Sequence, residues 1–269
     1  MEKVITIRQL QEIYLVMLSE FHEFCVANNL TYYMVDGTLL GAVREQGFIP
    51  WDDDVDIAMP RADYERFIKS NYDKIILCPP GKDKQCCFPY TKLFHAKVPV
   101  VYVEDEEFGM QGEVMVQFDI YPVDGLGNDY RKAQKYAKKI SWYKYLLYLN
   151  QSNDRSKNIL KNVVLEALRW LPGARIAKHI DLMMRKYRKK ESLFLTGWRE
   201  GAKNGNVVAA EVFGNPALLP FDRLHLYAPQ DYDTYLTNIY GDYKKPRRDN
   251  IGLRHDIKNR KAIKSMTEA

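Results

Sequence analysis

Several features are scarce or missing in this 269-residue sequence, and each absence narrows the class of protein. No run of about 18 apolar residues is present, so no transmembrane helix is indicated. The segment MEKVITIRQL lacks the apolar stretch of a signal peptide, and we therefore expect a cytoplasmic protein. Four cysteines are too few and too irregularly spaced for a disulfide framework, which favours reduced thiols.

Familiar motifs are missing as well. Neither GxxxxGK(S/T) nor GxGxxG occurs, so P-loop and Rossmann nucleotide sites are unsupported. Cys78, Cys86, Cys87 and His95 include no CxxC pair, and adjacent cysteines suit a tetrahedral zinc site poorly. No recognised RNA- or DNA-binding motif is present, and we expect no nucleic-acid partner.

The composition is that of a globular protein, with 46% hydrophobic and 28% charged residues, but the charge is unevenly distributed. Residues 131–190 hold 17 Lys/Arg against three acids, a balance of +14. Since the whole chain carries +5, the remainder carries −9. A segment this basic suggests attraction to phosphates on nucleic acid, anionic lipid or a phosphorylated glycan. A solvated helical face would give the same pattern.

Hydrophobic periodicity predicts a mixture of helices and strands. Apolar residues recur at helical spacing from about Thr6, a plausible N-cap, to Asn29. The remaining expected elements are short helices over 38–45 and 63–69, strands over 31–35, 55–59, 91–94, 98–103 and 113–121, and a turn at Asp124-Gly125. These elements indicate an α+β fold.

Changes in composition divide the chain into three parts. Residues 1–129 form the α+β core. Residues 130–194 are a basic helical insertion or subdomain, interrupted around 151–157 and at Pro172-Gly173. Residues 195–269 return to mixed patterns and complete the core before a polar tail.

The most informative stretch is the run Asp52-Asp53-Asp54-Val55-Asp56. Carboxylates this close repel one another, and a bound divalent cation removes that cost. Oxygen ligands suit Mg²⁺, with Mn²⁺ as a second choice. In a strand, Asp54 and Asp56 would project from one face as metal ligands, and Val55, Ile57 and Met59 would occupy the opposite, buried face. An EF-hand is excluded because its glycine and glutamate positions hold Ile57 and Asp63, whereas a solvated acidic turn is the simpler alternative.

Two further segments complete the expected site. Gly37 and Thr38 precede a short helix, and backbone N–H groups at a helix start attract phosphate. Arg44, about two turns further on, could bind an anionic group bidentately. Asp119 lies in a β-like run between apolar residues, where an unpaired carboxylate is expensive, and is our candidate for a third carboxylate.

Together these motifs resemble the LicD family. The resemblance is dense in DGTLLGAVREQGFIPWDDDVDIAMPRADYE and returns in FDIYPVDG and IYGDY. The family comprises phosphocholine and related transferases of bacterial surface glycans, is similar at its site to fukutin-type phosphotransferases, and belongs with the nucleotidyltransferase fold.

This resemblance implies a nucleotidyltransferase-like catalytic core, built as a mixed sheet flanked by helices. Gly37 and Thr38 would bind the donor phosphate. Asp54, Asp56 and Asp119 would hold Mg²⁺, and Asp119 is also the candidate base. The implied donor is CDP-choline or a similar CDP-linked alcohol, from which CMP leaves. The implied acceptor is a sugar hydroxyl of a polyprenyl-linked teichoic acid or lipopolysaccharide precursor, at the inner face of a membrane.

The remaining site assignments follow from the same resemblance. Asp52 matches a family acid, and His255 meets a C-terminal family pattern only loosely. Arg44 and Lys92 would contact phosphates, and Trp51 is the nearest candidate for a choline-binding aromatic. The basic segment 130–194 could rest on anionic lipid, which would make the protein peripheral to the membrane.

Two alternative functions stay open. The same carboxylates would serve a true nucleotidyltransferase, which releases pyrophosphate. The chain could also be a non-catalytic module that binds a membrane or a glycan.

Overall fold

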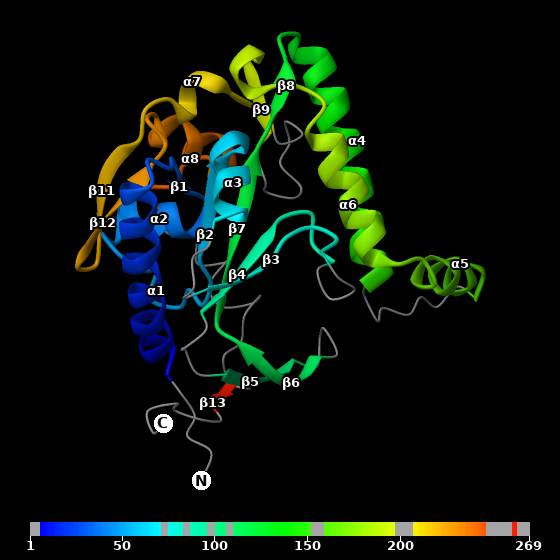
Figure 1. Ribbon diagram of the computed structural model, residues 1–269, viewed down its shortest axis with the longest axis horizontal. Helices are drawn as coiled ribbons and strands as arrows, with labels where there is room; N and C mark the ends of the chain where they lie inside the picture. Colours follow the sequence, from blue (N-terminus) through cyan, green and yellow to red (C-terminus); the bar gives the residue numbers. More distant parts are fainter. Residues whose placement is uncertain are drawn as a thin grey trace. The chain divides into compact units, whose positions relative to one another are not determined.

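The computed structural model describes residues 6–70, 75–82, 87–95, 100–105, 110–151, 159–196, 207–245 and 260–262 (Figure 1). The chain forms two compact units. Unit 1 comprises Met1–Ile76, Leu93–Pro122 and Glu211–Ala269, and unit 2 comprises Leu77–Lys92 and Val123–Ala210. Each unit therefore combines segments that are distant in the sequence.

A five-stranded sheet with flanking helices confirms the predicted α+β class. Its spatial order is β1 (Tyr33–Met34), β2 (Asp56–Pro60), β7 (Gln117–Val123), β4 (Thr91–His95) and β3 (Ile75–Cys78). Tyr33 pairs with Ala58 in the antiparallel contact between β1 and β2. Because β2 and β7 are neighbours, residues about sixty positions apart in the chain meet at the centre of this sheet.

Helix α1 (Ile7–Ala27) begins where its sequence signal predicted. Thr6 is the N-cap: its hydroxyl accepts a hydrogen bond from the Gln9 N–H, and the Gln9 side chain accepts one from the Thr6 N–H. Buried Phe21 packs edge-on against Tyr32 and against Phe118 of β7, with ring centroids 5.0 and 5.4 Å away. These aromatic contacts fix α1 against the sheet.

Unit 1 contains further helices and two small sheets. The helices are α2 (Asp36–Arg44), α3 (Arg61–Ile68), α7 (Ala210–Phe213), whose first residue belongs to unit 2, and α8 (Tyr232–Tyr240). Strands β11 (Ala217–Phe221) and β12 (Leu224–Ala228) form a hairpin, while β13 (Arg260–Ala262), β5 (Val100–Asp105) and β6 (Met110–Met115) form a three-stranded sheet.

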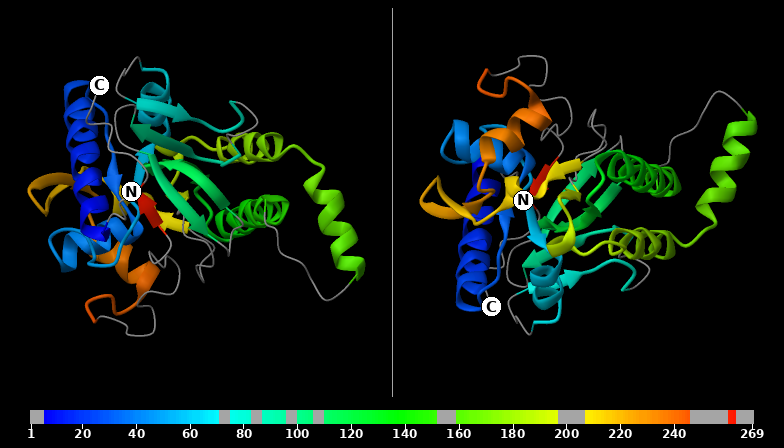
Figure 2. Two further views of the ribbon diagram at one scale, coloured as in Figure 1. Left: turned by 90° about the horizontal axis from the view of Figure 1, so that it is seen from below. Right: turned by 90° about the horizontal axis from the view of Figure 1, so that it is seen from above.

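Unit 2 is built on the basic helices. Helices α4 (Tyr130–Gln151) and α6 (Gly173–Met184) run side by side, and α5 (Ile159–Arg169) lies at the end of the pair (Figure 2). A sheet of β8 (Gly125–Gly127), β9 (Phe194–Thr196) and β10 (Val207–Ala209) accompanies them, with a short 3₁₀ turn, η1, at Lys189–Glu191. None of the helices in the described ranges is long and apolar enough to span a membrane.

Two local predictions are wrong. Asp124-Gly125 is not a turn, because Asp124 is buried and exchanges two hydrogen bonds with Thr196, at 2.9 and 3.0 Å, as Gly125 opens β8. The single strand expected over 113–121 is divided between β6 and β7, which lie in different sheets. In both places pairing with distant segments decides the conformation, and a local pattern does not show those partners.

The expectation of reduced thiols is wrong for Cys78. Cys78 is disulfide-bonded, whereas Cys25 and Cys87 carry free thiols. A disulfide depends on the distance between two sulfur atoms, which the spacing of cysteines in a sequence does not give.

Candidate functional site

The first turn of α2 forms one side of the site. The helix starts at Asp36, so Gly37 and Thr38 lie inside its first turn and not ahead of it. A Cβ atom on Gly37 would lie 3.2 Å from Asp52 Oδ2, closer than nearly all real Cβ contacts. Glycine therefore lets the Asp52 carboxylate approach the positive end of the helix dipole.

Thr38 links this helix to the central sheet. Its side chain is buried, and its hydroxyl oxygen accepts a hydrogen bond of 2.9 Å from the backbone N–H of Asp56. Thr38 thereby fixes the start of β2, where Asp56 is the first residue. Val55, Ile57 and Met59 are buried, as the alternating pattern predicted.

Adjacent strands bring two distant carboxylates together. The Tyr121 hydroxyl donates to Asp56 Oδ1 at 2.9 Å and lies 3.3 Å from Asp119 Oδ2. The Asp119 N–H also donates to the carbonyl of Val55, at 3.1 Å. Asp56 and Asp119 thus share one hydroxyl across the β2–β7 pair. Tyr121 was not predicted, although its spacing two residues after Asp119 places both side chains on one face of β7.

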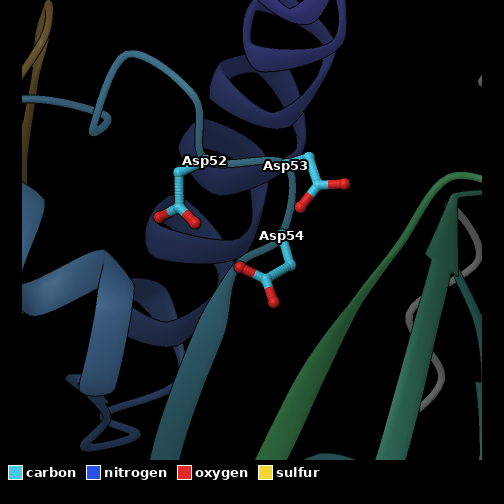
Figure 3. Close-up of side chains that lie close together, drawn as sticks. All are labelled: Asp52, Asp53 and Asp54. Atoms are coloured by element: carbon cyan, nitrogen blue, oxygen red, sulfur yellow. The ribbon is translucent and has the colours of Figure 1, made fainter. Parts of the chain in front are cut away.

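Asp52, Asp53 and Asp54 form the compact part of the cluster. Each offers a carboxylate oxygen, and these atoms all lie within 4.8 Å of one another. Asp52 and Asp54 turn toward each other, whereas the Asp53 side chain is buried (Figure 3). Among the described residues, this is the group of three carboxylates whose spacing suits a metal ion.

Crowding of these carboxylates changes their acidity. Burial raises the pKa of Asp56 well above its usual value, and repulsion by Asp54, Asp36 and Asp119 adds to the effect. Burial, followed by repulsion from Asp54, raises the pKa of Asp52 to about 8. The protein therefore holds carboxylates in a place where their charged forms are unfavourable.

These observations fit a divalent cation. Within the described part of the chain, no lysine or arginine forms an ion pair with Asp52, Asp54 or Asp56. Asp52 Oδ2 is buried and has no hydrogen-bond partner among the described residues. A hard cation such as Mg²⁺ takes oxygen ligands of this kind and would offset the repulsion.

Helix α1 is hydrogen-bonded to the loop between α2 and β2, which carries the acidic run. The buried Gln11 amide donates from Nε2 to the carbonyl oxygens of Ile49 and Asp52, at 3.1 and 3.0 Å. The Tyr14 hydroxyl donates to the carbonyl of Asp53, at 3.2 Å. Gln11 and Tyr14 therefore position the loop through its backbone. Neither side chain was predicted to act at this site.

We expect Gln11→Met to raise the Mg²⁺ concentration needed for half-maximal activity. The substitution preserves length but leaves two carbonyls without their donor, and a shift of about 1 Å in a site can cost about 100-fold in rate. Activity measured across a Mg²⁺ titration checks this expectation. Leu18→Val, a core change on the same helix, is the control for lost stability. A Mg²⁺ requirement equal to that of the wild type would contradict the positioning role.

The other predicted residues are placed as follows. The Arg44 side chain is largely buried, with Nη2 3.4 Å from Glu45 Oε1. Trp51 immediately precedes the acidic run and is 41% exposed. Lys92 belongs to unit 2, where its ammonium lies 4.4 Å from the centroid of the Phe88 ring. His255 lies outside the described residues.

Comparison with known proteins identifies the class of this site. Residues 29–76 match the family model described as "LicD/FKTN/FKRP, nucleotidyltransferase domain". The matched segment includes α2, the acidic run and β2, so the carboxylates of this loop lie in the part of the chain that is similar to this nucleotidyltransferase domain.

The more particular similarity is to LicD itself. The chain is 25% identical over 259 residues to the lipopolysaccharide cholinephosphotransferase LicD of Haemophilus influenzae, covering 90% of this chain and 93% of that protein. An uncharacterized protein of Rickettsia typhi is 29% identical over 175 residues, 56% of each chain. One of Rickettsia prowazekii is 28% identical over 179 residues, 56% of this chain and 66% of the relative. These matches confirm the resemblance to the LicD family.

Proposed function

We propose that this protein is a Mg²⁺-dependent enzyme that transfers phosphocholine from CDP-choline to a sugar hydroxyl of a lipopolysaccharide-type glycan. The observation that carries the proposal is a match over almost the full length of a lipopolysaccharide cholinephosphotransferase. Its support in the structure is the convergence of Asp56 and Asp119 on Tyr121, beside the acidic run of the matched segment.

Each part of the site has a role in this reaction. Asp54, Asp56 and Asp119 would hold Mg²⁺, because Asp56 and Asp119 share the Tyr121 hydroxyl and Asp54 and Asp119 both repel the Asp56 carboxylate. Asp52 and Asp53 adjoin them in the acidic run. The ion supplies charge neutralisation at the donor diphosphate. The α2 N-terminus, at Gly37 and Thr38, faces the donor phosphates.

Asp119 takes the proton of the attacking hydroxyl. The sugar oxygen forms a bond to the phosphorus that carries choline, the bond from that phosphorus to the CMP oxygen breaks, and CMP leaves. No covalent intermediate on the protein is needed, because positioning and electrostatics supply the rate enhancement.

Other residues bind the two ends of the donor. Arg44 contacts its phosphates, and the exposed Trp51 provides an aromatic face for the quaternary ammonium of choline. The acceptor is a polyprenyl-linked precursor of lipopolysaccharide or teichoic acid. Such an acceptor places the reaction at the inner face of a bacterial membrane, with this chain peripheral to it.

Product analysis tests the proposal. The purified protein is incubated with Mg²⁺, CDP-choline and a glycan acceptor, and CMP, pyrophosphate and phosphocholine-modified glycan are measured. CMP formed in equal amount with modified glycan supports the proposal. Pyrophosphate release from a nucleoside triphosphate would instead indicate a nucleotidyltransferase. Glycan binding without turnover would indicate a non-catalytic module.

A further inference from the structure

The outward face of α4 carries a continuous row of basic and aromatic side chains. The exposed residues along this face, at alternating spacings of four and three, are Arg131, Lys135, Lys138, Trp142 and Tyr145. The opposite side has the same spacing in the buried residues Ala133, Ala137, Ile140, Lys144 and Leu147. Helix α4 is therefore anchored by its small and apolar side and presents the basic-aromatic row to solvent.

The aromatic end of this row exposes a large apolar surface. Trp142 is 56% exposed and Tyr145 is 47% exposed, with ring centroids 6.1 Å apart. Tyr145 in turn stacks on the exposed Tyr148 at 6.4 Å. Soluble proteins rarely leave contiguous aromatic surface uncovered unless it binds something.

An ordered turn next to the C-terminal end of α4 carries a further exposed aromatic side chain. The Asn150 amide donates from Nδ2 to the carbonyls of Leu168 and Leu171, at 2.6 and 3.0 Å. This turn holds Trp170 outward with 87% of its surface exposed. Trp170 is therefore exposed because it lies in a turn that follows α5 and is hydrogen-bonded to Asn150 of α4.

The basic half of the row points to an anionic occupant. Within the described part of the chain, Lys135 and Lys138 form no ion pair with an acidic side chain, whereas the charge of Arg131 interacts with the Asp129 carboxylate. Lysine and arginine beside exposed Trp and Tyr is the pattern of helices that lie in a membrane interface, where the bases meet anionic headgroups and the rings enter the headgroup layer. A protein partner would explain the rings, but it would leave the unbalanced positive charge unexplained.

We propose that the outward face of α4, extended by the Trp170 turn, docks the protein on an anionic lipid surface. This docking does not depend on the proposed phosphocholine transfer. It supplies a physical reason for the strongly basic character of residues 131–190, to which the proposed reaction assigns no role.

Vesicle sedimentation tests the docking face. The wild-type protein is expected to bind phosphatidylcholine vesicles that contain phosphatidylserine, more tightly at low than at high salt, and to bind pure phosphatidylcholine weakly. Lys135→Gln/Lys138→Gln is expected to weaken binding about 30-fold, because each basic side chain contributes a factor of about five. Trp142→Ala/Tyr145→Ala is expected to weaken binding and to abolish the blue shift of tryptophan emission on vesicle addition.

Matched variants outside the face serve as controls. Lys69→Gln removes an exposed base of unit 1, and Leu218→Ala removes an exposed apolar side chain; both are expected to bind vesicles as the wild type does. All variants are checked for an unchanged melting temperature and for unchanged turnover of soluble substrates. Equal binding to both vesicle types, or wild-type binding by the two α4 variants, would overturn the proposal. A solution dimer lost in Trp142→Ala/Tyr145→Ala, without vesicle binding, would make the face a protein interface and would overturn it as well.

Discussion

Asp56→Asn is expected to lower phosphocholine transfer by about 10³-fold or more while making the metal-free protein more stable. Activity falls because Asp56 is a proposed Mg²⁺ ligand at the centre of the sheet, where its carboxylate accepts a hydrogen bond from the Tyr121 hydroxyl. Stability rises because asparagine removes a charge that burial, Asp54, Asp36 and Asp119 all disfavour. The amide oxygen still accepts the Tyr121 hydroxyl, so we expect a gain of about 1–3 kcal/mol in the free energy of unfolding.

The pH dependence of this gain has a definite sign. A carboxyl whose folded pKa is raised above its usual 3.8 costs no stability in acid, where it is protonated in both states. The cost grows as the pH rises above 3.8, because the unfolded chain loses this proton first, and it levels off above the folded pKa. The stability difference between Asp56→Asn and the wild type should therefore be smallest in acid and should grow as the pH rises. Chemical denaturation in a chelator at several pH values measures it.

Glu65→Gln, a carboxylate-to-amide change on α3, is the control variant. Glu65 forms exposed or partly buried ion pairs with Arg61 and Lys69, outside the acid cluster. It should leave turnover and the pH dependence of stability near those of the wild type. An Asp56→Asn protein that transfers phosphocholine at a near-normal rate would remove Asp56 from the site. An Asp56→Asn protein that is less stable than the wild type at neutral pH would contradict the inference that crowded carboxylates destabilise the metal-free fold.

The parts of this site that could be predicted from sequence are those encoded locally. The N-cap at Thr6 depends on side chains within one turn, and the burial of Val55, Ile57 and Met59 follows from period-two alternation along β2. Asp119 could be chosen because a charged residue between apolar neighbours in a strand requires a partner. Nothing in the sequence showed that its strand, β7, lies beside β2.

The parts that could not be predicted depend on contacts between distant segments. Tyr121 acquires its role only when β2 and β7 pair, and Gln11 acquires its role only when α1 lies against the loop between α2 and β2. Both side chains act through hydrogen bonds to residues at least 38 positions away. Their residue types, tyrosine in a strand and glutamine in an amphipathic helix, are ordinary in those places and carry no signal of their own.

Removal of divalent metal is expected to abolish transfer, and Mg²⁺ or Mn²⁺ to restore it. The same ion should stabilise the folded protein, because it binds carboxylates whose repulsion the metal-free fold must bear. At about 100 times its dissociation constant, a ligand specific for the folded state contributes about 2.7 kcal/mol, which corresponds to a rise of roughly 5–10 °C in melting temperature for a chain of this size.

Thermal unfolding of the chelator-treated protein, with and without Mg²⁺ and at matched ionic strength, measures this shift. In Asp56→Asn the metal-free melting temperature should be higher than that of the wild type, and Mg²⁺ should raise it much less, because a ligand and the charge that it neutralises are lost together. Matched NaCl separates specific binding from screening, since screening would act on both proteins. Full turnover in chelator, or the same Mg²⁺-induced shift in the wild type and in Asp56→Asn, would show that the carboxylates of this loop do not bind the ion.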